Sequence, residues 1–231
     1  MLNEIINNKL KEVNQLRETL DISGININSS KKNHFYKKLL NNQNNKKNSI
    51  IAEIKRRSPS KGMLAENLNV SKTVSEYESG GAACISVLTE KDYFNGSNED
   101  LLEAKNSINL PLLRKDFMLD PIQIYESKML GADCVLLIVS ALSQSTYKQL
   151  FELASKLDLD VLTEVHDIYE LDFALSQNAK LIGINNRNLK SFDVDINTSI
   201  DLARTINDND IVLVSESGIS SSSDIITLNS S

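Results

Sequence analysis

Cysteine and histidine are both scarce in this chain of 231 residues, which contains two of each. Cys84 and Cys134 each lie in an apolar, strand-like run rather than in a CxxC pair, so neither a disulfide framework nor a zinc site is expected. We predict that both thiols are buried and reduced. His34 and His166 lie far apart in the sequence without a neighbouring ligand pattern, which gives no basis for a metal site.

Basic residues are not in excess, and long apolar runs are missing. The chain has 25 Lys and Arg against 31 Asp and Glu, a formal net charge of -6 and a pI near 5.1. This balance argues against a nucleic-acid partner, whose phosphates favour a basic face. No apolar run approaches the roughly 20 residues that cross a bilayer, and the N-terminus lacks the apolar core of a signal peptide. We therefore expect a cytoplasmic protein that does not bind membranes.

The length and a hydrophobic content of 41% suit one large domain. From Leu2 to Leu20, apolar residues recur at spacings of three and four, which predicts an amphipathic helix. A second short helix is expected around His34 to Leu40, and the polar stretch Asn41 to Asn48 is expected to be a loop. Residues 1–48 are thus predicted to form a helical extension packed on a main body of residues 49–231.

The main body alternates short apolar runs with segments of helical length. One such helix is expected to open at Asp120-Pro121 and to close at Gly131, and another to open with the capping-box pattern of Asp167 and Glu170. Alternation every 20 to 35 residues, roughly, implies a parallel sheet that is either closed into a barrel or open and doubly wound. The seven predicted strands are Ile50–Ile54, Cys84–Leu88, Leu110–Leu113, Cys134–Ile138, Val161–Val165, Leu181–Ile184 and Ile211–Val214.

Chemically active residues recur at the C-terminal ends of these strands, which favours the (β/α) barrel, because a barrel brings all of these ends to one mouth. An open sheet would more typically carry a glycine-rich phosphate loop after its first strand, and no GxGxxG or Walker A pattern is present. The residues in question are Lys55, Lys115, Glu164, Asn185 and Glu216.

Strand alternation places an apolar residue below a charged one on the same face in three runs, at Leu113 and Lys115, Leu162 and Glu164, and Val214 and Glu216. The same rule puts Glu53 and Lys55 on one face. Any one of these residues could belong to a surface ion pair, but the repetition across strands indicates a charged mouth above a packed floor. Lysines and glutamates crowded in such a mouth can act as general acids and bases. A Schiff base at either lysine is the second interpretation.

Two loops are candidate anion sites. Ser217 and Gly218 follow the seventh predicted strand, where small residues let backbone N–H groups approach a phosphate. Ser58 and Lys61 follow the first strand and could supply further contacts. An ordinary turn and a solvated loop are the respective alternatives.

At these residues the chain resembles the indole-3-glycerol phosphate synthases, in ordered blocks from about residue 50 to residue 219. The blocks are IIAEIKRRSPSKG, SVLTEKDYFNGSNEDL, PLLRKDFMLDPIQIYES, GADCVLLIVSAL, LTEVHDIYEL, IGINNRNLKSFDVD and VSESGI. The resemblance implies a (β/α)8 barrel with an N-terminal helical extension. It also implies a ring closure without a metal or other cofactor in tryptophan biosynthesis, in which 1-(2-carboxyphenylamino)-1-deoxyribulose 5-phosphate loses CO2 and water. A functional association with other enzymes of that pathway is a further expectation.

The resemblance also implies roles for individual residues. Lys115 would be the general acid, Glu164 the base, and Lys55 the partner of the substrate carboxylate and an acid for dehydration. The remaining assignments are Glu53, Asn185 and Glu216 for orienting the reacting groups, Arg187 for supporting that network, Phe94 and Phe117 for packing near the aromatic ring, and Ser58, Ser217 and Gly218 for the phosphate.

The sequence departs from the family at its end, because no eighth strand follows the helix predicted near Leu228 to Ser231. We therefore expect a sheet that is open between its first and seventh strands, and weak or absent turnover by the polypeptide as written. Two other interpretations remain open: a non-catalytic copy whose barrel does not close, and another phosphate-binding barrel enzyme such as a sugar-phosphate isomerase.

Overall fold

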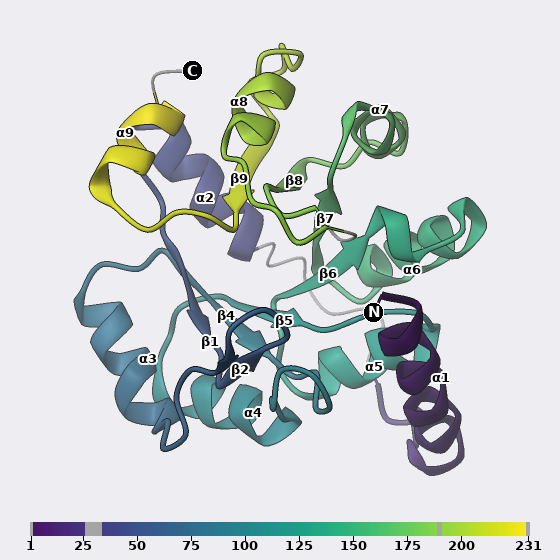
Figure 1. The fold of residues 1–231 in the computed structure, drawn as a ribbon. Helices are drawn as coiled ribbons and strands as arrows, with labels where there is room; N and C mark the ends of the chain where they lie inside the picture. The colour runs from purple at the N-terminus through teal and green to yellow at the C-terminus, as the bar shows by residue number, and fades with distance from the viewer. Residues whose placement is uncertain (1, 26–33, 189–190, 230–231) are drawn as a thin grey trace.

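The computed structural model describes residues 2–25, 34–188 and 191–229, in which helices and strands alternate after two N-terminal helices (Figure 1). The strands of the main sheet are β1 (Ile51–Ile54), β4 (Cys84–Leu88), β5 (Leu112–Lys115), β6 (Cys134–Ile138), β7 (Asp160–Val165), β8 (Leu181–Asn185) and β9 (Val212–Glu216). The helices are α1 (Leu2–Thr19), α2 (His34–Asn44), α3 (Val70–Ser79), α4 (Asn98–Ser107), α5 (Pro121–Met129), α6 (Gln144–Lys156), α7 (Ile168–Ser176), α8 (Asn197–Ala203) and α9 (Ser222–Asn229), with a 3-10 turn η1 (Val139–Ala141) after β6.

The main sheet is entirely parallel and has the order β1-β4-β5-β6-β7-β8-β9. The helices between its strands lie on the outside (Figure 1). Within the described part of the chain, β1 and β9 each pair with one strand and not with each other. The fold is therefore the predicted barrel wall with an open seam, and the prediction of seven strands with these neighbours is confirmed.

Three local predictions were wrong. Asn41–Asn48 was expected to be a loop, yet α2 continues to Asn44, because Gln43 Nε2 donates to the carbonyl groups of Asn209 and Ile211 and ties this polar turn to the body. The third predicted strand, β5, begins at Leu112 rather than Leu110, after Pro111, which has no N–H to donate to a sheet.

The third error concerns Glu170. Asp167 does cap α7 by accepting the N–H of Glu170 at 2.9 Å, but the Glu170 side chain turns to His166 instead of completing a capping box. A short antiparallel hairpin, β2 (Arg57–Ser58) with β3 (Gly62–Met63), was not predicted at all. It folds the loop after β1 back over itself.

Apolar side chains fill both sides of the sheet. The outer core joins the sheet to the surrounding helices, and it includes the fully buried Leu137 and Leu150. The inner core is closed by α2, whose Phe35 and Leu39 pack with Leu113 and other residues inside the wall. Both predicted thiols are buried and free. Burial raises the pKa of the Cys84 thiol to about 12, so it stays protonated.

Helix α1 packs beside α5 (Figure 1) and is anchored by charged side chains. Lys9 is buried and lies 2.9 Å from Asp116, the residue after β5, and Arg17 pairs with Asp120 at the start of α5. The N-terminal helix is thereby fixed next to the C-terminal end of β5. None of the helices in the described ranges is long and apolar enough to cross a membrane.

Candidate active site

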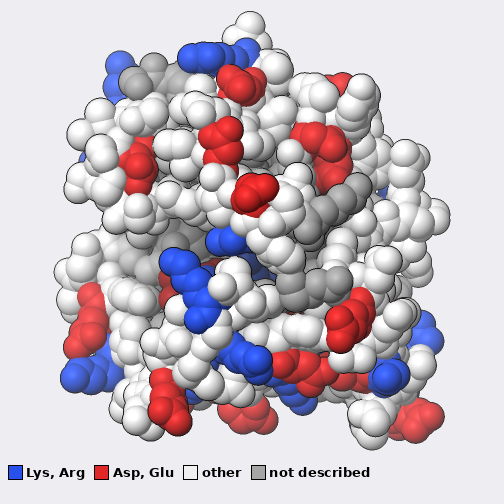
Figure 2. All heavy atoms as spheres, viewed as in Figure 1, with Lys and Arg blue, Asp and Glu red and all other residues white. Residues whose placement is uncertain are grey.

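The C-terminal ends of the strands surround a cavity of about 1420 Å³. Figure 2 shows the surface hollowed near the middle of this face, with Lys and Arg side chains beside the hollow. All of the predicted site residues border this cavity: Glu53, Lys55, Ser58, Phe94, Lys115, Phe117, Glu164, Asn185, Arg187, Glu216, Ser217 and Gly218. The structure thus brings together side chains that come from six strands and their loops.

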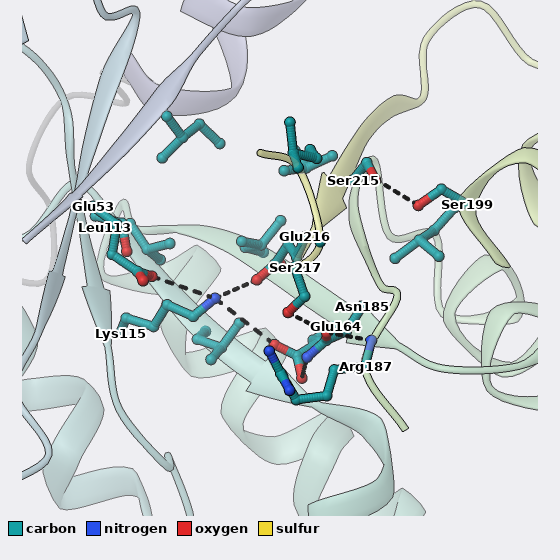
Figure 3. Close-up of a pocket in the computed structure, with 18 of the residues that line it drawn as sticks. Glu53, Leu113, Lys115, Glu164, Asn185, Arg187, Ser199, Ser215, Glu216 and Ser217 are labelled. Carbon is teal, nitrogen blue, oxygen red and sulfur yellow. Dashed lines mark hydrogen bonds and ion pairs between the residues drawn. The ribbon is translucent and has the colours of Figure 1, made fainter. Parts of the chain in front are cut away.

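Lys115, the last residue of β5, lies at the centre of this group (Figure 3). Its ammonium nitrogen pairs with Glu216 Oε2 at the end of β9. The same nitrogen lies 3.9 Å from Glu164 Oε2 on β7 and 4.0 Å from Glu53 Oε2 on β1. One cation therefore links three carboxylates from strands that are far apart in the sequence.

Lys55 forms the second cationic position. It follows β1, and its ammonium group pairs with Glu53 Oε1 two residues earlier, as strand alternation predicts. Its side chain keeps 32% of its accessible surface, against 20% for Lys115. Lys55 is therefore the more accessible of the two cations for an anion that enters the cavity.

Asn185 at the end of β8 connects the base candidate to the loop after β9. Its Nδ2 donates to Glu164 Oε1 at 3.1 Å, and its Oδ1 accepts from Ser217 Oγ at 2.9 Å. The backbone N–H of Arg187 donates to the same Oδ1 at 3.0 Å, while the Arg187 guanidinium donates to the carbonyl of Phe192. Asn185 thus fixes the orientation of Glu164 and of its own loop together.

Burial and neighbouring charges shift the pKa values of the Glu164 and Glu216 carboxylates in opposite directions. Burial acts to lower the pKa of Lys115, but Glu216, Glu53 and Glu164 together raise it well above its usual value, so the ammonium stays charged. Burial acts to raise the pKa of Glu164, yet His166, Lys115 and Asn185 hold it below its usual value. For Glu216, burial and the adjacent carboxylates outweigh Lys115 and raise the pKa. The mouth therefore holds a charged acid beside an ionised base.

The candidate anion site lies on both edges of the open seam. Ser58, a residue of β2 in the hairpin, is buried, and its Oγ accepts the N–H of Lys61 at 3.2 Å. After β9, Ser217 and Gly218 have φ values of 68° and 79°. This left-handed backbone suits the glycine and is uncommon for the serine, and such strained turns often occur at functional sites.

A family model for indole-3-glycerol phosphate synthase matches residues 2–231. The chain belongs to this family. An indole-3-glycerol phosphate synthase from Chlorobium chlorochromatii (strain CaD3) is 47% identical over 180 residues, which cover 78% of this chain and 70% of that protein. The fold class and the family suggested by the sequence blocks are both confirmed by these findings.

Solved structures resemble this member of the indole-3-glycerol phosphate synthase family in fold. A 3-keto-L-gulonate-6-phosphate decarboxylase from Vibrio cholerae has a TM-score of 0.59 and 15% identity, over 78% of this chain and 82% of that one. An N-acetylmannosamine-6-phosphate 2-epimerase from Clostridium perfringens has a TM-score of 0.55 and 12% identity, over 71% and 78%. At these identities the likeness supports the barrel architecture alone.

Two residues that support the site of this indole-3-glycerol phosphate synthase family member were not predicted from the sequence. Glu90 is buried after β4, and its carboxylate accepts the backbone N–H groups of Tyr93 at 2.8 Å and Phe94 at 3.0 Å, which fixes the loop that carries Phe94. Gly183 on β8 leaves room for Glu216, since a Cβ at this position would collide with the Glu216 carboxylate. A glycine inside a strand is a known signal of close approach, and it could have identified Gly183.

His166 is the third residue that was missed. It was treated only as a non-ligand, yet its ring lies beside Glu164. The alternation rule that paired Glu53 with Lys55 applies equally to Glu164 and His166, two residues apart at the end of β7, and would have found it.

Proposed function

We propose that this chain is an indole-3-glycerol phosphate synthase, a carboxy-lyase that acts on 1-(2-carboxyphenylamino)-1-deoxyribulose 5-phosphate. The observation that carries the proposal is the position of Lys115, whose ammonium nitrogen faces Glu216, Glu164 and Glu53 in the cavity at the strand ends. Membership of the family supplies the substrate class, a small phosphorylated molecule.

Lys115 is proposed as the general acid of ring closure. The aromatic carbon that bears the carboxylate forms a bond to the ketone carbon, and the ketone oxygen takes a proton from Lys115. The bond to the carboxylate then breaks, CO2 leaves, and the electron pair of that bond restores the aromatic ring. The three carboxylates raise the pKa of Lys115 and keep its ammonium group charged, so that it stabilises the developing alkoxide, the strong base that takes its proton.

Glu164 is proposed as the base of the dehydration that follows. It takes the proton from the carbon between the ring nitrogen and the former ketone carbon, and the hydroxyl group leaves as water with a proton from Lys55. A double bond forms, which completes the indole ring. The low pKa of Glu164 keeps the carboxylate ionised for this step.

The remaining residues bind and orient the substrate. Lys55 attracts the carboxylate, while Phe94 and Phe117 on the cavity wall pack against the aromatic ring. The phosphate is proposed to bind between the loop of Ser58 and the backbone turn at Ser217 and Gly218. Glu53, Asn185 and Glu216 hold the two lysines and the base in place, and the Arg187 N–H supports Asn185.

The test is a single-turnover assay with enzyme in excess over the substrate. We expect release of CO2 together with a fluorescent indole product, at a low rate because Glu53 and Glu216, which surround Lys115, lie on two seam strands that the described sheet does not join. An isomerase would convert a phosphorylated aminosugar without releasing CO2. Absence of both product and measurable substrate binding would contradict the proposal.

Three further points are proposals. Residues 1–48 form a helical extension packed on the barrel, the chain is cytoplasmic, and it associates with other enzymes of the tryptophan pathway. Mixing the chain with those enzymes and measuring the mass of the complexes by light scattering tests the association. An unchanged mass in every mixture would contradict it.

A further inference from the structure

His166 lies directly after β7, two residues beyond the proposed base Glu164. Its side chain is 13% exposed, in spite of its position in the connection between β7 and α7. A mostly buried imidazole at the edge of the reaction cavity needs partners for both ring nitrogens. Nδ1 hydrogen-bonds to Glu170, whereas Nε2 faces the Glu164 carboxylate at 3.3 Å without making a hydrogen bond.

Glu170, in the first turn of α7, holds the imidazole from one side. Its Oε2 lies 3.0 Å from His166 Nδ1 and also accepts the backbone N–H of His166 at 2.9 Å. Glu170 is itself placed by the cap of α7, since its own N–H donates to Asp167 Oδ1 at 2.9 Å. The ring is therefore oriented by the start of a helix and not by the flexible part of a loop.

Glu164 faces the other side of the ring. His166 Nε2 lies 3.3 Å from Glu164 Oε1, and Asn185 Nδ2 donates to this same oxygen at 3.1 Å. The second oxygen, Oε2, lies on the side of Lys115, 3.9 Å from its nitrogen. Asn185 thus hydrogen-bonds to Oε1 and the His166 ring lies against the same oxygen as a charge contact, while Oε2 faces the cation and the reaction cavity.

The charges around the ring favour its protonated form. The groups that face it are Glu164 from β7 and Glu170 from α7, with Lys115 of β5 beyond Glu164. Burial acts to lower the pKa of His166, but the two carboxylates outweigh burial and raise the pKa to about 9. A cationic ring next to Glu164 in turn favours the ionised carboxylate.

We propose that His166 is a positioning residue that orients the Glu164 carboxylate, so that Oε2 is the oxygen that accepts the substrate proton, and that Glu170 fixes His166 for this purpose. The inference deepens the proposed function and its kinetic part rests on it. His166 itself does not touch the reacting atoms in this scheme.

The kinetic test compares His166→Gln with the wild-type chain by single-turnover assays across pH. Glutamine can still donate a hydrogen bond but cannot carry a charge. We expect the rate constant of the chemical step to fall by about tenfold to a hundredfold, with substrate binding changed less than about twofold, because a displaced base slows the reaction without weakening binding. We also expect the acidic limb of the pH profile to move to higher pH, a change that a purely structural role would not produce.

Matched variants separate positioning from folding. Glu170→Gln should reproduce part of the effect, while Asp172→Asn, an exposed carboxylate on the same helix, should leave the rate unchanged. Thermal unfolding of each variant checks that it is folded. A folded His166→Gln chain with the wild-type rate and pH profile would overturn the proposal.

A second measurement does not depend on activity. The chain has two histidines, so a titration followed by NMR of the imidazole signals resolves His166, which is assigned by the signal that is lost in His166→Gln. In Glu164→Gln we expect the pKa of His166 to fall by about one unit or more. An unchanged His166 titration would overturn the coupling even if the enzyme were active. Absent turnover with an intact coupling would instead count against the proposed function.

Discussion

The wall formed by β4 to β7 and the two seam strands β1 and β9 contribute to the same cavity from very different surroundings. Every residue of β4 and β6 is buried, whereas β1 and β9 are mostly half-buried. The wall carries Lys115 and Glu164, the proposed acid and base. The seam carries Glu53 and Glu216, which orient the reacting groups, and Lys55, directly after β1, which is proposed to bind the substrate carboxylate and to be the acid of the dehydration.

This division indicates that the wall strands position the acid and the base, and that the seam strands position the charged groups around them. Lys115 and Glu164 are held by strands with a neighbour on each side. Glu53 and Glu216 reach Lys115 from opposite edges of the sheet, so the ammonium group of Lys115 contacts both edges in the cavity. Substitutions in the wall should therefore have the largest effects on the rate of the chemical step and on the free energy of unfolding. Substitutions in the seam should mainly change the positions of the groups around Lys115.

The largest expected effect comes from the wall residue Lys115. Lys115→Met removes the proposed proton donor and leaves Glu216 without its partner, and we expect the chemical step to slow by about a thousandfold or more. The single-turnover assay measures this change. Lys156→Met, on the exposed side of α6, removes a lysine away from the cavity and should keep the wild-type rate. A loss below about tenfold in Lys115→Met would remove Lys115 from the role of acid.

Stability should differ between the wall and the seam in the same way. Leu137 on β6 is fully buried, and Leu137→Ala should lower the free energy of unfolding by about 2–5 kcal/mol. Leu213 on β9 is half-buried, and Leu213→Ala should lower it by roughly 1 kcal/mol. Urea denaturation of the two variants checks the contrast. Equal losses would mean that the seam is packed as tightly as the wall.

The strand ends of this fold were predictable because the short apolar runs of a parallel sheet, separated by helical segments, are visible in the sequence. Apolar runs and the charges that follow them predict that Lys115 and Glu164 lie at the ends of strands on one face of the barrel. The hairpin at Arg57–Met63 was not predictable, since it depends on long-range contacts such as the hydrogen bond from the Arg57 N–H to the carbonyl of Phe94. The helical Asn41–Asn44 turn was missed for the same reason, because its partners lie more than 160 residues away.

The residues of the site could be predicted from the sequence, but the hydrogen bonds and ion pairs among them could not. Alternation and family blocks named the residues that border the cavity, yet they did not indicate that Lys115 would be shared among three carboxylates. Glu90 was missed because it binds the backbone of its own loop, which has no pattern in the sequence. Such partnerships depend on the final packing of the loops.

Gly183 offers a sharper comparison, because it lies on β8 between the wall and the seam strand β9. A methyl group in Gly183→Ala would displace the Glu216 carboxylate from its position beside Lys115. We expect the chemical step to slow by about tenfold to a hundredfold with little change in Tm. Gly24→Ala is the matched control, since no atom lies near enough to its new methyl group. An unchanged rate in Gly183→Ala would show that Glu216 reaches Lys115 from other positions.

The last expected effect is a pH dependence of stability that arises on the wall. The folded-state pKa of His166, about 9, lies above the ordinary value of 6.5, so the folded chain binds this proton more tightly than the unfolded chain does. Its contribution to the free energy of unfolding is then complete below pH 6.5 and is lost as the pH rises through about 9. We expect wild-type and His166→Gln chains to differ by roughly 3 kcal/mol more at pH 6 than at pH 10, measured by urea denaturation. A difference that stays constant with pH would mean that His166 is not held as a cation between Glu164 and Glu170, and that the wall keeps the base ionised through Lys115 and Asn185 alone.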